Sequence, residues 1–277
     1  MSRTDQAIDI ENHKAQIKQT FDTVADQYGR GGCRFFHSCG EHMAKIISLT
    51  GNETTIDLAA GTGATSIPLA KRLPNGNVTG VDLSDAMLAE ARQYAESNSI
   101  TNFDTCVGDF TKLPFPAEHF HHATCSFGLF FVPDMVDALK HISSKVKKGG
   151  RVAISGFCGD SFMPAAQLCM ERLKAYDLEV PEQIAWRRMS KPEQLQELFT
   201  NAGLSDLAID RKSFGYHVTP LEWWDVVWNA GFRGLVSQLG DKLEQFKAEH
   251  LKELESISGP EGFWMEIDVN FSVGTVN

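Results

Sequence analysis

The segment from Thr54 to Asp82 constrains the fold more than any other part of this chain. A short apolar stretch leads into the turn Gly61-Thr62-Gly63, which is followed by a helix-like run and a second apolar stretch that ends at Asp82. Glycine lets the backbone bend sharply and lets a ligand approach it closely. An acid about 20 residues beyond such a turn is placed to accept hydrogen bonds from a ribose diol. The segment therefore predicts a βαβ unit that binds a nucleoside.

Further strand and turn signals follow in regular order. A third strand near Phe103 to Gly108 ends in Gly108-Asp109-Phe110, and Leu113-Pro114-Phe115-Pro116 precedes a fourth strand, His121 to Phe127. A helix from about Asp134 to Val146 and the turn Lys147-Lys148-Gly149-Gly150 lead to a fifth strand, Arg151 to Phe157. Strands that alternate with helices predict an α/β protein with a mostly parallel sheet.

Taken together, these motifs resemble the class I methyltransferases that use S-adenosylmethionine, in particular the ubiquinone/menaquinone-biosynthesis C-methyltransferase group and its small-molecule relatives. The matching segments, in the family's order, are 56–63, 80–84 with Met87-Leu88, 108–109, 113–116, 126–129 and 149–151. The resemblance covers about residues 50 to 157. It implies a Rossmann-like, seven-stranded sheet of order 3-2-1-4-5-7-6, whose last two strands form an antiparallel hairpin.

The chain departs from the family pattern at three places. His121 stands where the family usually has an acid, and Lys148 replaces the proline of its Lys-Pro-Gly-Gly turn. The quinone enzymes continue Ser-Phe-Gly-Leu with Arg-Asn-Val, but this chain has Phe130-Phe131-Val132. The third change lies in the region that faces the methyl acceptor, so it argues against a quinone substrate.

The resemblance also implies the cofactor and its contacts. Gly61 and Gly63 are expected in close backbone contact with S-adenosylmethionine, Asp82 on its ribose diol, and Met87 on its adenine. Asp109 with Phe110 is expected at the amino edge of the adenine. The full predicted set is Tyr28, Asp57, Ala59, Gly61, Gly63, Ser66, Asp82, Leu83, Met87, Asp109, Phe110 and Ser126.

Residues 1–50 are expected to form an N-terminal helical cover, and residues 51–277 the methyltransferase domain. Apolar spacing predicts helices over residues 8–28 and 35–49. Phe21-Asp22 to Tyr28 resembles the Phe-Asp-x-x-Ala-x-x-Tyr segment of the family, in which the tyrosine often lies beside the cofactor; alternatively, Tyr28 only packs the helix onto the domain. Helical cap segments are expected at about 159–200 and 220–257, with strands near 206–217 and 263–273.

Aromatic residues in the second cap segment suggest where a substrate binds. Leu221, Trp224, Trp228 and Leu235 recur on one helical face, which is either ordinary core or the wall of an apolar pocket. The residues predicted to contact the substrate are Phe36, Phe130, Phe131, Trp224 and Trp228. A small, at least partly hydrophobic acceptor is therefore expected.

Composition limits the partners. A net charge of −10 disfavours nucleic acid, whose binders neutralise phosphates with Lys and Arg. No apolar run approaches the roughly 20 residues of a membrane span, and the N-terminus lacks the apolar core of a signal peptide, so a cytoplasmic protein is expected. The six scattered cysteines are expected to be reduced thiols; an arsenic site built from Cys33, Cys39, Cys158 and Cys169 is a disfavoured alternative.

The catalytic chemistry stays open at this point. His37, His42 and His217 are candidates for a general base, but each fits a surface or packing histidine better, so no base is named. Strand alternation puts His121 and His122 on opposite faces, which argues against a metal site. A protein or RNA methyltransferase, a dinucleotide oxidoreductase and a cofactor-binding module without catalysis are the alternative functions. The acceptor, the methylated atom and the oligomeric state do not follow from the sequence.

Overall fold

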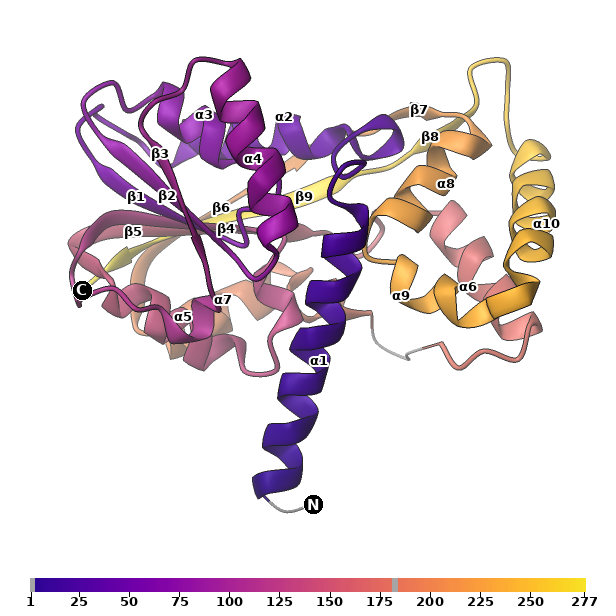
Figure 1. Ribbon diagram of the computed structural model, residues 1–277, viewed down its shortest axis with the longest axis horizontal. Coiled ribbons are helices and arrows are strands. Elements are labelled where there is room, and N and C mark those ends of the chain that lie inside the picture. The colour runs from indigo at the N-terminus through magenta and orange to yellow at the C-terminus, as the bar shows by residue number, and fades with distance from the viewer. Residues whose placement is uncertain (1–2, 181–183) are drawn as a thin grey trace.

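A seven-stranded sheet is the centre of the computed structural model, which describes residues 3–180 and 184–277 (Figure 1). The strands are β1 (Thr54–Leu58), β2 (Asn77–Asp82), β3 (Phe103–Val107), β4 (Phe120–Ser126), β5 (Val146–Phe157), β6 (Leu204–Ser213) and β9 (Asp268–Val276). Their order is β3-β2-β1-β4-β5-β9-β6. The first five strands pair in parallel, and β9 is antiparallel to both β5 and β6. The predicted α/β fold and strand order are confirmed, with β9 as the seventh strand of the sheet.

Helices cover both faces of this sheet. In Figure 1, α2 (Phe35–Ile46), α3 (Ser66–Lys71) and α4 (Asp85–Ser97) lie on one face, and α5 (Met135–Ser144) and α7 (Pro192–Asn201) on the other. The inner strands bury apolar residues such as Ile56, Leu58 and Val81 completely, as expected of a sheet that is covered on both sides.

The strand predictions were wrong in two regions of the chain. The expected turn at Lys147–Gly150 lies within β5, whose pairing with β4 shifts register between Phe120 and His122. Gly149 has a φ of +77° there, a conformation that glycine adopts without strain, so the strand continues through an irregularity.

The other error concerns the last strands. The expected strand near 206–217 divides into β6 and β7 (Tyr216–Val218), and the expected strand near 263–273 divides into β8 (Phe263–Met265) and β9. β7 and β8 pair with each other as a separate two-stranded sheet. Gly215 lies at the break, where a Cβ atom would come within 2.7 Å of the Trp264 ring.

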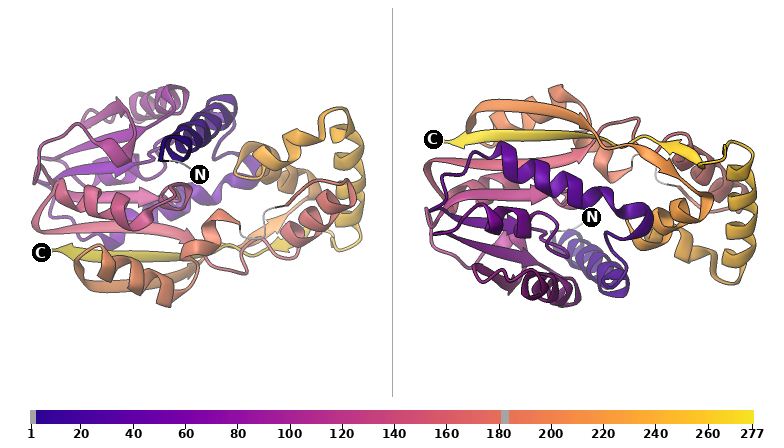
Figure 2. Two further views of the ribbon diagram at one scale, coloured as in Figure 1. Left: turned by 90° about the horizontal axis from the view of Figure 1, so that it is seen from below. Right: turned by 90° about the horizontal axis from the view of Figure 1, so that it is seen from above.

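A second group of helices lies beside the end of the sheet. It contains α6 (Ala165–Ala175), α8 (Pro220–Asn229), α9 (Arg233–Val236) and α10 (Leu243–Glu255), with a 3-10 turn at Ser237–Lys242. The helical cap segment expected at 220–257 therefore contains α8, α9, the 3-10 turn and α10. The long helix α1 (Arg3–Val24) lies between this group and the sheet in all three views (Figures 1 and 2). Among the described residues, no helix is long and apolar enough to cross a membrane.

Candidate cofactor and acceptor cavities

The smaller of two adjoining cavities lies at the carboxyl ends of β1, β2 and β4, where doubly wound sheets bind ligands. It has a volume of about 110 Å³. Nine of the predicted cofactor residues line it: Tyr28, Ala59, Gly61, Asp82, Leu83, Met87, Asp109, Phe110 and Ser126. The sequence motifs at the ends of four strands, β1 to β4, are therefore brought together around one space.

The glycine turn and the acid at the end of β2 are bonded to each other. The backbone N–H of Gly61 donates to Asp82 Oδ2 and that of Ser84 to Asp82 Oδ1, both at 2.9 Å. Burial raises the pKa of Asp82 above its ordinary value. A carboxylate has about four lone-pair sites, so Asp82 can accept further hydrogen bonds from a ligand.

The turn also leaves room for a ligand. Gly61 has a φ of +53°, and the atom nearest to a Cβ built on it is Tyr28 Cε1, at 3.9 Å. A side chain at this position would therefore enter the space that the backbone leaves free. The site fits the nucleoside part of S-adenosylmethionine, because it offers the exposed backbone of Gly61, the carboxylate of Asp82 and the apolar side chains of Leu83 and Met87.

Three predicted contact residues lie beneath the wall instead of on it. Ser66 Oγ donates to Asp57 Oδ2 at 2.5 Å, and Thr124 Oγ1 donates to Asp57 Oδ1 at 2.7 Å. Burial raises the pKa of Asp57 to about 6, against the effect of these two hydroxyls. A Cβ on Gly63 would lie 3.3 Å from both Ala91 and Ile67, because this glycine packs against α4. Asp57, Gly63 and Ser66 thus support the turn from the core side.

Asp109 is already engaged by the N-terminal helix. Its Oδ1 accepts hydrogen bonds from Thr111 N (2.8 Å) and Oγ1 (2.7 Å), and its Oδ2 accepts one from Lys14 Nζ at 2.6 Å. Burial opposes ionisation, but the bonds from Lys14 and Thr111 hold the pKa of Asp109 below its ordinary value. Sequence reasoning missed Lys14, although its spacing from Ile17, Lys18 and Phe21 placed it on one face of α1.

The larger cavity, of about 510 Å³, adjoins the smaller one. The two share a wall made of Ile17, Phe21, Tyr28, Phe36, Phe127, Phe131 and Pro133. Of the predicted substrate residues, Phe36, Phe130 and Phe131 line the larger cavity. Phe157 and Trp186 line it as well and were not predicted; Phe157 ends a buried strand, and Trp186 belongs to a 3-10 turn with no periodic signal.

Trp224 and Trp228 line neither cavity. Their rings stack on each other with centroids 6.3 Å apart and planes at 12°. Lys247 Nζ lies 5.3 Å from the Trp224 ring centroid, and Arg233 Cζ lies 4.1 Å from that of Trp228. These two cationic side chains cover that face of α8, whereas Leu235, the last member of the predicted stripe, belongs to α9 and lines the larger cavity.

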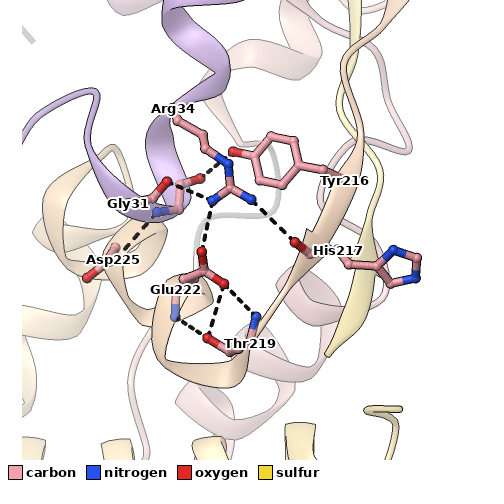
Figure 3. A network of polar contacts seen from close by, with 8 residues as sticks. Gly31, Arg34, Tyr216, His217, Thr219, Glu222 and Asp225 are labelled. Atoms are coloured by element: carbon pink, nitrogen blue, oxygen red, sulfur yellow. Dashed lines mark hydrogen bonds and ion pairs between the residues drawn. The ribbon is translucent and has the colours of Figure 1, made fainter. Parts of the chain in front are cut away.

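A polar cluster around Arg34 joins the residues that precede α2 to β7 and α8 (Figure 3). The Arg34 guanidinium donates to Glu222 Oε1 at 2.9 Å and to the carbonyl oxygens of Gly31 at 3.1 Å and His217 at 3.4 Å. It also lies 3.8 Å from the centre of the Tyr216 ring. Because Arg34 immediately precedes α2 and Glu222 belongs to α8, this cluster fixes the segment carrying Phe35 and Phe36 against the helical group.

The histidines that were weighed as bases lie elsewhere. His37, His42 and His217 line neither cavity, whereas His13 of α1 lines the larger one. His121 Nδ1 accepts the backbone N–H of Thr54 at 3.0 Å, an acceptor role that an acid would also fill at this place. Within residues 3–180 and 184–277, no group of His, Cys, Asp and Glu could hold a metal ion.

Comparisons with known proteins agree with this architecture. The family model described as "Methyltransferase domain" matches residues 56–150. The aklanonic acid methyltransferase DauC of Streptomyces sp. (strain C5) is 32% identical over 145 residues, which are 52% of this chain and 66% of that protein. A demethylmenaquinone methyltransferase of Listeria welshimeri is 26% identical over 216 residues, 70% of this chain and 90% of that protein.

Solved structures show the same fold. The YcgJ protein of Bacillus subtilis superposes with a TM-score of 0.57 at 16% identity, and the superposition covers 86% of this chain and 98% of the YcgJ chain. A phosphoethanolamine N-methyltransferase 2 of Haemonchus contortus, solved with S-adenosylhomocysteine, gives 0.53 at 17% identity, covering 86% of this chain and 52% of its own. This chain is an S-adenosylmethionine-dependent methyltransferase, and it has the fold of the solved structures above. S-adenosylmethionine is therefore the cofactor of this methyltransferase.

Proposed function

We propose that this methyltransferase transfers the methyl group of S-adenosylmethionine to a small, partly hydrophobic molecule held in the larger cavity. The wall that both cavities share is the observation that carries this proposal. Methyl transfer needs the acceptor atom close to the methyl group of the donor and in line with its S–CH3 bond, and two adjoining cavities bring the two molecules together. The two relatives named above are methyltransferases of aklanonic acid and demethylmenaquinone, which are small molecules. The narrow, apolar surroundings also favour such an acceptor over a protein or an RNA.

In this proposal the smaller cavity holds the nucleoside. Asp82 accepts hydrogen bonds from the ribose diol, the Gly61 backbone lies against the ligand, and Met87 and Leu83 pack on the adenine. Asp109 and Phe110 lie at the adenine's amino edge, with Lys14 competing for the same carboxylate oxygen. Tyr28, Ala59 and Ser126 complete the wall.

The side chains between the cavities position the acceptor and keep water out. When bound, S-adenosylmethionine would supply a methyl group on a positively charged sulfur, to be taken by a nucleophile of the acceptor with S-adenosylhomocysteine as the leaving group. Tyr28, Phe36 and Phe131 border both spaces and exclude water from the region between them. Burial raises the pKa of Tyr28, so its hydroxyl stays protonated and can donate a hydrogen bond but not accept a proton as a base.

Methyl transfer from labelled S-adenosylmethionine tests the acceptor class. The purified chain is incubated with a metabolite extract, a protein fraction and an RNA fraction, each freed of the other two. We expect label to appear only in the metabolite extract. Label in the protein or RNA fraction would contradict a small-molecule acceptor, while calorimetry with S-adenosylhomocysteine measures cofactor binding independently.

A further inference from the structure

The ammonium group of Lys14 is bonded to the carboxylate that the adenine is proposed to contact. Lys14 Nζ donates a hydrogen bond to Asp109 Oδ2 at 2.6 Å. The Lys14 side chain is 15% exposed and that of Asp109 is 20% exposed, so this ion pair lies largely inside the structure. Both residues line the smaller cavity. The protein itself therefore uses the oxygen to which the adenine's amino group would donate.

The other oxygen of Asp109 offers the adenine no alternative. Oδ1 already accepts the backbone N–H of Thr111 at 2.8 Å and the Thr111 hydroxyl at 2.7 Å. A carboxylate oxygen has about two lone-pair sites, so Oδ1 is fully used and only Oδ2 remains. The cavity volume of about 110 Å³ is also below the roughly 300–1,000 Å³ of pockets that enclose a small ligand. Because Lys14 lines this space, its departure would give the cofactor both room and an acceptor.

A second carboxylate gives Lys14 an alternative partner outside the cavity. Glu11 lies nearly one turn before Lys14 on α1, and its Oε1 is 3.6 Å from Lys14 Nζ. The Glu11 side chain is 62% exposed and is not among the described residues that line either cavity. The flexible four-carbon stem of lysine lets the ammonium group turn from one acid to the other. Lys14 therefore has an inner partner, Asp109, and an outer partner, Glu11.

We propose that Lys14 is an autoinhibitory gate of the cofactor site: it holds Asp109 until the adenine's amino group displaces it toward Glu11. The proposal rests on the placement of the adenine at Asp109 that is proposed above. A ligand that must displace an internal contact binds with an affinity reduced by the fraction of protein that is competent. Removing the ammonium group frees Asp109, whereas removing the Glu11 carboxylate leaves Lys14 only its inner partner. The two substitutions should therefore change cofactor affinity in opposite directions.

Calorimetry with S-adenosylhomocysteine on the full chain measures both changes. Lys14→Met should raise the affinity about 5- to 10-fold, because a charge-assisted bond no longer has to be broken and the outer ion pair compensates only part of it. Glu11→Gln should lower the affinity about 2- to 5-fold, since an exposed ion pair contributes less. Lys14→Arg keeps the charge and should not raise the affinity. An unchanged or lower affinity in Lys14→Met, or an unchanged or higher one in Glu11→Gln, overturns the gate.

Lys112→Met is the matched control for the loss of a positive charge. Lys112 Nζ lies 3.2 Å from Glu11 Oε1, and the Lys112 side chain is 70% exposed. This ion pair also joins α1 to the turn after Asp109, but it leaves the Asp109 carboxylate untouched. Its loss should change the affinity by less than about 2-fold. Equal gains in Lys14→Met and Lys112→Met would show an effect of net charge alone and would overturn the gate.

An analogue of S-adenosylhomocysteine with purine in place of adenine separates the gate from the adenine contact. In the Lys14→Met protein, S-adenosylhomocysteine should bind about 5-fold more tightly than this analogue, which lacks the amino group. Equal binding of the two would contradict the proposed placement of the adenine at Asp109, and with it the gate. The analogue itself should gain no affinity from Lys14→Met. A gain as large as that of S-adenosylhomocysteine would show that the substitution only widens the cavity, which overturns the gate and leaves the adenine contact standing.

Discussion

Replacing Asp82 by alanine tests the proposed nucleoside site and the turn at the same time. The carboxylate accepts the backbone N–H groups of Gly61 and Ser84, each at 2.9 Å. A buried N–H group without a partner costs about 1–3 kcal/mol. Because the adjoining cavity admits water, we take the lower end for each and expect the free energy of unfolding to fall by about 2 kcal/mol. Loss of charge-assisted bonds to the ribose diol should cost a further 1.5–3 kcal/mol of binding, or about 10- to 150-fold in affinity.

Calorimetry with S-adenosylhomocysteine and chemical denaturation measure these two effects separately. Asp85→Ala is the matched control, since Asp85 lies three residues away, is exposed, and pairs only with Arg92 on the surface of α4 among the described residues. This control should leave affinity unchanged and alter stability by less than about 1 kcal/mol. A folded Asp82→Ala protein with unchanged affinity would refute the assignment of the diol to Asp82.

Three further substitutions follow from the geometry. Gly61→Val should abolish S-adenosylhomocysteine binding in calorimetry, because its side chain enters the space beside Tyr28. The control Gly203→Val, at a φ of +81° with open space around it, should only lower the melting temperature. Equal losses of affinity in the two variants would contradict a special role of Gly61. Asp57→Asn should flatten the pH dependence of stability. Because the pKa of Asp57 is raised to about 6 in the folded state, the unsubstituted chain should lose up to about 3 kcal/mol of stability as the pH rises from about 4 through 6. If the melting temperatures of the two proteins change with pH in the same way across this range, the prediction is wrong. Arg34→Met should lower the melting temperature by about 2–4 °C, since its ion pair is half exposed, and should leave cofactor affinity unchanged. The control Arg92→Met should lower the melting temperature by less. An equal fall in the two variants would show that the Arg34 cluster has no special role in stability.

The sequence predicts the sheet and most of the smaller cavity because their signals are local. The segment from Thr54 to Asp82 contains a strand, a turn, a helix and an acid in fixed order, and the family resemblance orders the strands that follow. The placement of Asp57 beneath the wall was not predictable in the same way, because it depends on Thr124 of β4, 67 residues away. The bond between Lys14 and Asp109 joins residues 95 positions apart.

The larger cavity was harder to predict for a related reason. Its unpredicted rings, Phe157 and Trp186, come from a strand end and a 3-10 turn, neither of which has a helical or strand period to show where the side chain faces. The Trp224 and Trp228 stripe did have such a period, but packing against Arg233 and Lys247 took up that face. Periodicity thus predicted which residues are buried better than which residues border an empty space.

The position of α1 couples the entry and release of the two ligands. Ile17 and Phe21 border both cavities, and the helix is tied to the cofactor side by Lys14 on Asp109 and by Asp22 on Ser84, whose hydroxyl donates at 2.5 Å. A single displacement of this helix, hinged at the glycines that follow it, would open both cavities together. Turnover would then follow the rate of helix opening rather than the rate of methyl transfer.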